Sequence, residues 1–279
     1  MADILGIVFK QFSSHLCASK YTEVSSPESG ALVVGDENIN RSLLLLSAVT
    51  AASELAVKVL FFTQSQIQSL PVTFQGGRRA DCLKKIRFVY PKTLEELLED
   101  VASLHELVSE PGALPSLLIV DGLERYVCGP AAQDKIPQEA QSAAAHLVAL
   151  LHDTAAFLTQ KLGDRDENQG QSRVIVSFQP ERIGQDGCDM FALDPLLSVL
   201  ERYLPMRCTS EKVRRVEGQD EWLLDLSGPG LQVNGDGNIE KRAQWHVVVQ
   251  PNGALEFCPV SPEKEDTPQG QNLVEVKDE

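Results

Sequence analysis

The sequence predicts an α/β fold with a mainly parallel central sheet, helices on both of its faces and an antiparallel C-terminal edge. Short, continuously apolar runs alternate with helical segments up to Pro180, which is typical of parallel strands buried on both faces. After Pro180 the runs become strand pairs, and the turn at 251–253 joins two of them as a hairpin. The chain has 279 residues, of which 43% are hydrophobic, enough for one sizeable core.

The N-terminal segment predicts a short amphipathic helix. Its apolar residues recur at helical spacing: Ile4, Leu5, Val8, Phe9, Phe12 and Leu16. We expect this helix to pack on the core, with an interaction arm as the alternative. Polar residues with two breakers follow at 22–30 and indicate a linker. We therefore predict an N-terminal helix and linker at 1–29, a core at 30–260 and, because the end is rich in Pro, Gln and acidic residues, a disordered tail at 261–279.

Within the core, the apolar runs predict successive parallel strands at 31–34, 59–63, 86–90, 117–120 and 174–178. Leucine- and alanine-rich or amphipathic stretches predict helices at 43–56, 93–107 and 138–162. Thr93 stands three residues before Glu96, which predicts a capping box. The stretch 193–204 fits either a strand or a short helix. Antiparallel strands are predicted at 222–226, 245–249 and 255–260.

Charge and cysteine usage limit the possible functions. The net charge of −15 excludes a general nucleic-acid binder, so any DNA contact must come from a local basic patch or a partner. The six cysteines show no metal-ligand spacing and read as scattered thiols of a reducing compartment. No apolar run reaches the roughly 18 residues that a spanning helix needs, and 1–10 lacks a secretory pattern. We expect an intracellular protein with no membrane contact.

One octapeptide follows the first strand and opens a helix, which is the context of a phosphate-binding Walker A loop. It reads Gly35, Asp36, Glu37, Asn38, Ile39, Asn40, Arg41 and Ser42. Gly35 and Ser42 hold the first and last motif positions, whereas Asn40 replaces the second glycine and Arg41 the lysine. Arg41 keeps the charge but has a larger, planar head. The two acidic residues oppose a triphosphate, and an ordinary polar turn is the alternative interpretation.

Two later strand ends complete the candidate nucleotide site. The run at 117–120 ends in Asp121, the Walker B pattern, in which the carboxylate supports magnesium. If ATP and Mg²⁺ bind, Ser42 and Asp121 are the predicted metal ligands. The strand at 174–178 is followed by Gln179, whose amide is placed to sense a phosphate. Each of these residues also fits the simpler role of a polar residue at the end of a buried strand.

The order of these elements resembles the RecA recombinase core. More closely, Val59-Leu60-Phe61-Phe62-Thr63-Gln64 and Pro115-Ser116-Leu117-Leu118-Ile119-Val120-Asp121-Gly122-Leu123 resemble the SWIM-domain-protein-associated recombinase paralogues of the metazoan Shu complex. The resemblance covers 30–260 and implies a RecA-like P-loop ATPase core. It also implies a nuclear role in homologous recombination DNA repair, single-stranded DNA binding and weak ATPase activity. The implied partners are an obligate SWIM-domain zinc protein, a recombinase and other recombinase paralogues.

ATP hydrolysis is expected to be weak or absent. In RecA-type enzymes a glutamate after the second strand activates water, and the matching place here holds Thr63 and Gln64, which cannot act as carboxylate bases. Asn40 and Arg41 point the same way. The order of the strands and the family resemblance favour a recombination mediator, and the altered motif residues suggest that it acts in the manner of a pseudo-ATPase. The alternatives are an active P-loop ATPase or kinase on another substrate, and a nucleotide-free pseudo-ATPase scaffold.

The DNA-binding loops implied by the resemblance would fall at 126–137 and 180–194, which carry Lys135 and Arg182. A denser basic cluster follows Gly76-Gly77 and consists of Arg78, Arg79, Lys84, Lys85 and Arg87. It fits a phosphate-backbone contact or a solvated loop equally well. Lys212, Arg214 and Arg215 form a weaker candidate.

Overall fold

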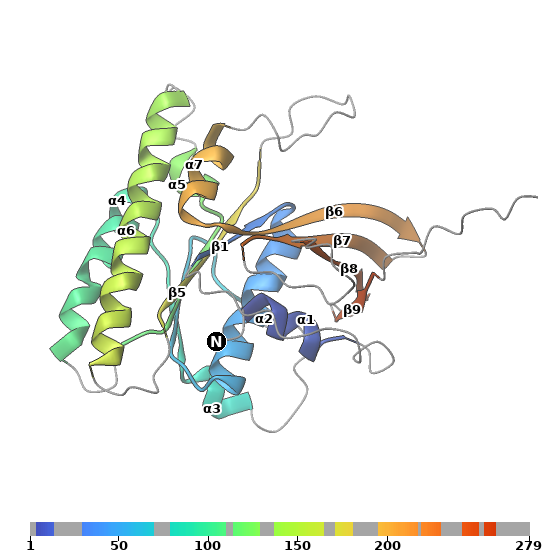
Figure 1. Ribbon diagram of the computed structural model, residues 1–279, viewed down its shortest axis with the longest axis horizontal. Helices are drawn as coiled ribbons and strands as arrows, with labels where there is room; N and C mark the ends of the chain where they lie inside the picture. Colours follow the sequence, from blue (N-terminus) through green and yellow to red (C-terminus); the bar gives the residue numbers. More distant parts are fainter. Residues whose placement is uncertain are drawn as a thin grey trace, which may run out of the picture.

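The computed structural model describes residues 4–13, 30–69, 79–109, 114–128, 137–164, 171–180, 195–216, 219–229, 242–250 and 254–260. Its strands form one nine-stranded sheet in the order β3-β2-β4-β5-β1-β6-β7-β8-β9 (Figure 1). The strands are β1 (Gly30–Val34), β2 (Val59–Thr63), β3 (Ile86–Val89), β4 (Leu117–Asp121), β5 (Arg173–Phe178), β6 (Met206–Val216), β7 (Gln219–Ser227), β8 (Arg242–Val249) and β9 (Leu255–Pro259). Pairing is parallel from β3 to β6 and antiparallel from β6 to β9.

Helices cover both faces of the parallel part of the sheet. They are α1 (Ile4–Gln11), α2 (Glu37–Glu54), α3 (Arg79–Leu83), α4 (Leu94–Ala102), the 3₁₀ helix η1 (Ser103–Ser109), α5 (Glu124–Val127), α6 (Pro137–Gly163) and α7 (Pro195–Tyr203). Figure 1 shows α4 and α6 on one side of the sheet and α1 and α2 on the other. This is the predicted α/β core with a mainly parallel sheet, helices on both faces and an antiparallel C-terminal edge.

Each face of the sheet carries its own hydrophobic core. One core joins α1, α2 and α3 to alternate residues of the parallel strands and to β6–β9. The other joins α4, η1, α6 and α7 to the remaining residues of those strands. Because neighbouring residues of a strand point to opposite faces, a strand covered on both faces must be apolar throughout. The uninterrupted burial of β1, β2 and β4 agrees with this requirement.

Residues 195–216 form a helix and a strand that the sequence pattern did not assign. The ambiguous stretch at 193–204 contains helix α7. The following strand, β6, pairs in parallel with β1 and antiparallel with β7, so it joins the two halves of the sheet. The sequence analysis assigned no strand to β6, because polar residues occupy much of its second half. The hairpin of β8 and β9 is confirmed.

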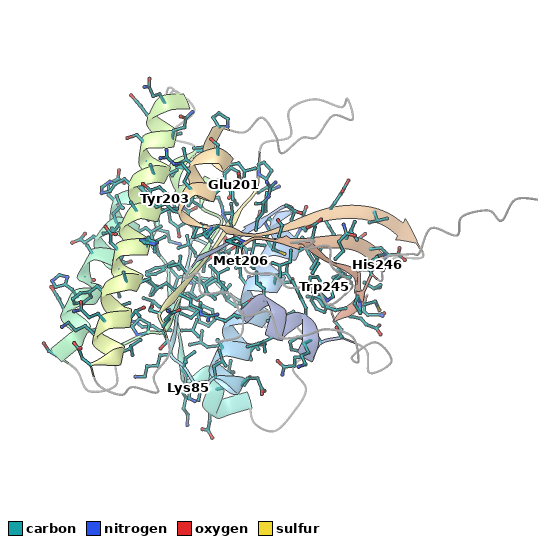
Figure 2. All side chains as sticks on the ribbon, viewed as in Figure 1. Lys85, Glu201, Tyr203, Met206, Trp245 and His246 are labelled. Atoms are coloured by element: carbon teal, nitrogen blue, oxygen red, sulfur yellow. The ribbon has the colours of Figure 1, made fainter. Side chains whose placement is uncertain are left out.

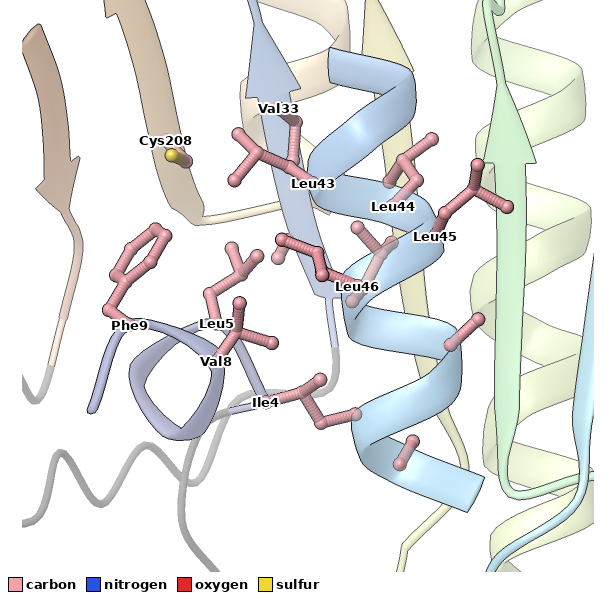
Figure 3. Close-up of a cluster of buried hydrophobic side chains, with 14 of the residues drawn as sticks. Ile4, Leu5, Val8, Phe9, Val33, Leu43, Leu44, Leu45, Leu46 and Cys208 are labelled. Carbon is pink, nitrogen blue, oxygen red and sulfur yellow. The ribbon is translucent and has the colours of Figure 1, made fainter. Parts of the chain in front are cut away.

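Helix α1 packs on the core, as expected. Figure 3 shows its apolar residues facing α2 and the antiparallel strands. Phe9 is fully buried, with ring centroids 4.5 Å from Trp245 and 5.4 Å from Phe257. The helix ends at Gln11, and Leu16, residues 22–29 of the predicted linker and the predicted tail at 261–279 lie outside the described residues. Gly30, the last residue of the predicted linker, instead begins β1.

The start of one helix and the capping contacts of another differ from the prediction. Helix α2 begins at Glu37, six residues before the predicted 43, because Asp36 accepts a hydrogen bond from the Asn38 N–H (2.9 Å) and caps it. Helix α4 has only half of the predicted capping box. Thr93 accepts from the Glu96 N–H at 3.2 Å, but the Glu96 carboxylate accepts from the Lys92 N–H instead of that of Thr93.

No helix in the described part of the chain combines the length and apolar character that crossing a bilayer requires.

Candidate functional site

The predicted nucleotide residues meet at the carboxyl ends of three adjacent strands. Strand β5 lies between β1 and β4, so the segments that follow these strands are neighbours. Ligands of open parallel α/β sheets bind at this edge. Helix α2 follows β1 after two residues, and α5 follows β4 after two residues. The sheet order therefore assembles the predicted site, although its parts are distant in the sequence.

The junction between β1 and α2 is shorter than the loop that the Walker A interpretation implies. Gly35 has φ +150°, and a Cβ there would lie 1.8 Å from Oγ of Ser210 on β6, so the position requires glycine. Its N–H donates to the Phe178 carbonyl (3.2 Å), while the Asn40 N–H donates to Asp36 O (2.9 Å) within the helix. These main-chain donors are thus satisfied inside the protein.

The side chains of this junction are also engaged. Asn40 is 2% exposed, and its Nδ2 donates to the carbonyls of Gly35 (3.1 Å) and Phe178 (3.4 Å). It ties the start of α2 to the ends of β1 and β5. Ser42 Oγ donates to the Asn38 carbonyl (2.8 Å), one turn back in the helix. Ile39 is buried in the core beside α1 and α2. The altered motif positions act here as structural contacts.

Four charged side chains form an ion network at the carboxyl end of β4 and the start of α2. Arg41 Nε contacts Asp121 Oδ2 at 2.9 Å, and its NH2 contacts Glu37 Oε1 at 2.9 Å. Arg125 NH1 contacts the same Glu37 oxygen at 3.0 Å, and its NH2 contacts Asp121 Oδ1 at 3.3 Å. Each carboxylate lies between both guanidiniums. The network joins the first turn of α2 to the end of β4.

Asp121 is almost completely buried, with 1% exposure, and neutral groups complete its surroundings. Thr63 Oγ1 donates to Asp121 Oδ2 at 2.9 Å, and Ser177 Oγ lies 3.5 Å from Oδ1. Gly122 follows with φ +71°, and a Cβ there would lie 2.1 Å from NH2 of Arg125. The glycine leaves the room in which this guanidinium packs.

A second carboxylate lies beside the network. Burial raises the pKa of Glu124 to about 7, because desolvation disfavours its charged form. The main-chain N–H of Gln179 donates to Glu124 Oε2 at 2.9 Å, and Arg125 Nε lies 3.8 Å from Oε1. The contact of Gln179 with this site therefore runs through its backbone. Glu124 therefore titrates near neutral pH beside the ion network, but it follows β4 and not β2, after which the carboxylate base of RecA-type enzymes was expected.

As it stands, this arrangement does not fit a magnesium–triphosphate. The hydroxyl of Ser42 is turned toward its own helix, and Asp121 is held by two guanidiniums and a hydroxyl. Those contacts use the oxygens that a magnesium shell would need. The assignment of 35–42, Asp121 and Gln179 to nucleotide binding stays a prediction, and it requires the first turn of α2 to rearrange.

Sequence reasoning missed Arg125, Glu124 and the Thr63 hydroxyl contact. A signal was present, since a Glu-Arg pair follows the Walker B aspartate by three residues. Only the pairing of β2 with β4, however, brings Thr63 opposite Asp121.

The described part of the basic cluster lies at the amino ends of the parallel strands, opposite the carboxyl ends that carry the candidate nucleotide site. Lys84 and Lys85 directly precede β3, so they lie at its amino end, and Figure 2 shows Lys85 near α3. Lys84 is exposed and pairs with Asp81 at 3.0 Å, while Arg87 is exposed on β3. Lys58, which the sequence analysis did not include, is exposed at the amino end of the neighbouring strand β2.

A solvated loop was one interpretation of the basic cluster, but residues 79–83 form the short helix α3. Several predicted DNA contacts cannot be placed, because their side chains lie outside the described part: Arg78, Arg79, Lys135, Arg182, Arg214 and Arg215. Lys212 lies on β6 and pairs with Asp220 at 2.9 Å. DNA binding by any of these residues stays a prediction.

Comparisons with known proteins were made for the whole chain. The chain is 34% identical to mouse ATPase SWSAP1 over 262 residues, which covers 91% of this chain and 84% of that protein. It is 33% identical to human ATPase SWSAP1 over 223 residues, which covers 78% of this chain and 83% of that protein. Among solved structures, a KaiC-like protein of the archaeon Pyrococcus horikoshii matches 84% of this chain and 91% of its own, with 11% identity and a TM-score of 0.47. No protein-family model matches the chain.

Proposed function

Because the chain belongs to the ATPase SWSAP1 family, we propose that it is a RecA-like recombinase paralogue that promotes homologous recombination DNA repair in the nucleus. It acts with a SWIM-domain zinc protein on a recombinase or its paralogues, and the complex binds single-stranded DNA. The support is the family membership, the RecA-like sheet and the resemblance of the two strand segments around Thr63 and Asp121. ATP hydrolysis is weak or absent in this proposal.

The observation that carries the low ATPase activity is the ion network. Glu37, Arg41, Asp121 and Arg125 form ion pairs with one another at the place where a triphosphate and its metal would be held. Opening the network would separate the arginines from the nearly buried Asp121. A buried carboxylate without its ion-pair partners is unstable, so a ligand that opens the network must offset this cost. The same observation favours a second candidate, a pseudo-ATPase scaffold that needs no nucleotide.

The DNA part of the proposal places the nucleic acid at the amino ends of β2 and β3. Lys58, Lys85 and Arg87 lie there on neighbouring strands, since Val59 pairs with Ile86. Phosphate contacts by lysine and arginine supply much of the affinity for DNA. A local group of basic side chains can make such contacts even when the net charge of the protein is negative. The surface is separate from the candidate nucleotide site, so DNA binding need not depend on ATP.

The test uses the full chain together with its SWIM-domain partner. Binding of a labelled single-stranded oligonucleotide is measured by fluorescence anisotropy, with and without magnesium–ATP. Lys58→Glu with Lys85→Glu should weaken binding at least about tenfold and flatten its salt dependence. Lys10→Glu, an exposed lysine on α1, serves as the control and should change little.

The cellular half of the test is a recombination reporter in cells that lack the protein. We expect Ser42→Ala to restore recombination as well as the parent chain, since turnover is not required. Absence of DNA binding by the complex, together with no recombination defect in the cells, would refute the proposal. Rapid ATP turnover that is lost on Ser42→Ala would instead establish the active ATPase.

A further inference from the structure

The carboxylate of Glu37 lies between two guanidinium groups that belong to different elements. Its Oε1 is 2.9 Å from Arg41 NH2 in α2 and 3.0 Å from Arg125 NH1 in α5. The arginine side chains are 25% and 21% exposed, and that of Glu37 is 41% exposed. Two convergent guanidiniums are a recognition site for phosphate as well as for carboxylate, because both anions present paired oxygens to the planar fork.

The two carboxylates of the network differ in how firmly they are held. Asp121 is 1% exposed and accepts a hydrogen bond from Thr63 in addition to its contacts with the arginines. Glu37 projects from the first turn of α2 at the rim and is far more exposed. Of the two anions, Glu37 is therefore the one that can leave without exposing a buried charge.

The charge balance of the network points in the same direction. Two arginines face two carboxylates, so the group is neutral while Glu37 remains. Glu124, the third carboxylate nearby, is desolvated and adds little negative charge below neutral pH. Removal of the Glu37 charge leaves one positive charge in excess, with two partly exposed guanidiniums available to an anion.

We propose that Glu37 is an internal anion that occupies a phosphate-binding arginine pair, so that Arg41 and Arg125 bind a phosphate-bearing ligand only when Glu37 is displaced. The inference deepens the proposed function, since it concerns the site where that function places low nucleotide turnover. Arg125 is one of the two guanidiniums that would bind the phosphate, and it lies outside the Walker A and Walker B positions.

The physical effect is competition between a tethered and a free anion. A group held within reach on the same chain has an effective concentration in about the millimolar range. The apparent affinity for a phosphate ligand is reduced by the fraction of molecules in which Glu37 is displaced, so displacement in about one molecule in ten lowers it about tenfold below that of the unoccupied arginine pair. The cost applies to nucleotide and to free phosphate alike, because both present the same anionic group.

Isothermal titration calorimetry of the full chain tests the proposal, with inorganic phosphate and ATP as separate titrants and no magnesium. Glu37→Gln should bind both at least about tenfold more tightly than the parent chain, by the competition above. Glu54→Gln makes the same chemical change at the far end of α2, where Glu54 is exposed, and should bind like the parent. Arg125→Ala in the Glu37→Gln background should remove the gain.

The outcomes separate the ligand sources and the two proposals. A gain for both titrants identifies the phosphate group, and a gain for ATP alone identifies nucleotide; either result supports the inference. Equal affinities of parent and Glu37→Gln, with thermal unfolding confirming that both are folded, would overturn it. Glu37→Ser provides a second variant if Glu37→Gln does not fold. DNA binding by the complex tests the proposed function independently, since the proposed DNA surface lies at the amino ends of β2 and β3, away from Glu37.

Discussion

Replacement of Glu124 by glutamine should stabilise the protein in a pH-dependent way. The carboxyl group is desolvated beside the ion network, and its pKa is raised from 4.5 to about 7. Glutamine keeps an oxygen that can accept the Gln179 N–H, which now donates to Glu124 at 2.9 Å. The substitution therefore removes the ionisable group and preserves its hydrogen bond.

The size of the effect follows from proton linkage. The folded state holds the proton of Glu124 up to about pH 7, whereas the unfolded chain loses it near 4.5. The free energy of unfolding of the parent chain therefore falls as the pH rises through this window. The pKa of Glu124 differs by about 2.5 between the folded and the unfolded state. Each pKa unit corresponds to about 1.4 kcal/mol, so the total effect on the free energy of unfolding is about 3 kcal/mol. The variant should exceed the parent by about 1 kcal/mol at pH 5 and about 3 kcal/mol at pH 8.

Urea unfolding, followed by the fluorescence of Trp222 and Trp245 between pH 5 and pH 8, measures this difference. Both tryptophans are buried and report on the antiparallel part of the sheet. Glu106→Gln, an exposed glutamate on η1, is the control and should show no growing difference. A stability difference for Glu124→Gln that stays constant across the pH range, or that favours the parent at pH 8, would refute the reasoning.

Three further substitutions probe the site and the core by urea unfolding. Gly122→Ala should lower the free energy of unfolding by about 1 to 3 kcal/mol, because φ is +71° and the new Cβ meets a guanidinium. Gly163→Ala, where a Cβ meets nothing within 4 Å, should change it by no more than about 0.5 kcal/mol; equal effects would contradict the steric argument. Asp121→Asn should cost about 2 to 3 kcal/mol, since it leaves two arginines without their buried partner; a neutral result would show that the network contributes nothing to stability. Phe9→Ala should cost about 3 to 5 kcal/mol and Lys10→Ala almost nothing; similar small effects would mean that α1 does not pack on the core in solution.

The ion network changes how the altered Walker A segment is understood. Seen only as a motif, Arg41 is an imperfect substitute for a lysine that reaches phosphate. In the fold it bonds Asp121 and Glu37, and Arg125 repeats both contacts from the other side. The substitutions are therefore compatible with a site whose charges are satisfied without a ligand.

The sequence by itself was sufficient for most of the core. Short continuous apolar runs that alternate with longer helical stretches are typical of strands covered on both faces, so the parallel strands and the helices between them were predictable from local pattern. Asp121 and Gln179 were predictable in the same way, because polar residues that end such strands gather at one edge of the sheet. Strand β6 escaped prediction, since its second half carries polar and charged residues on an exposed part of the sheet.

Only the tertiary structure decided what the site residues contact. Residues 63, 121 and 177 come from three different strands, and their hydroxyl and carboxylate contacts depend on the sheet order and register. Arg125 reaches Glu37 across 88 positions of the chain, and the start of α2 depends on the Asp36 cap. Local sequence determines the periodicity that forms helices and strands. The pairing of charges between elements depends on distances that exist only after the sheet has assembled, because ion-pair energies fall with separation.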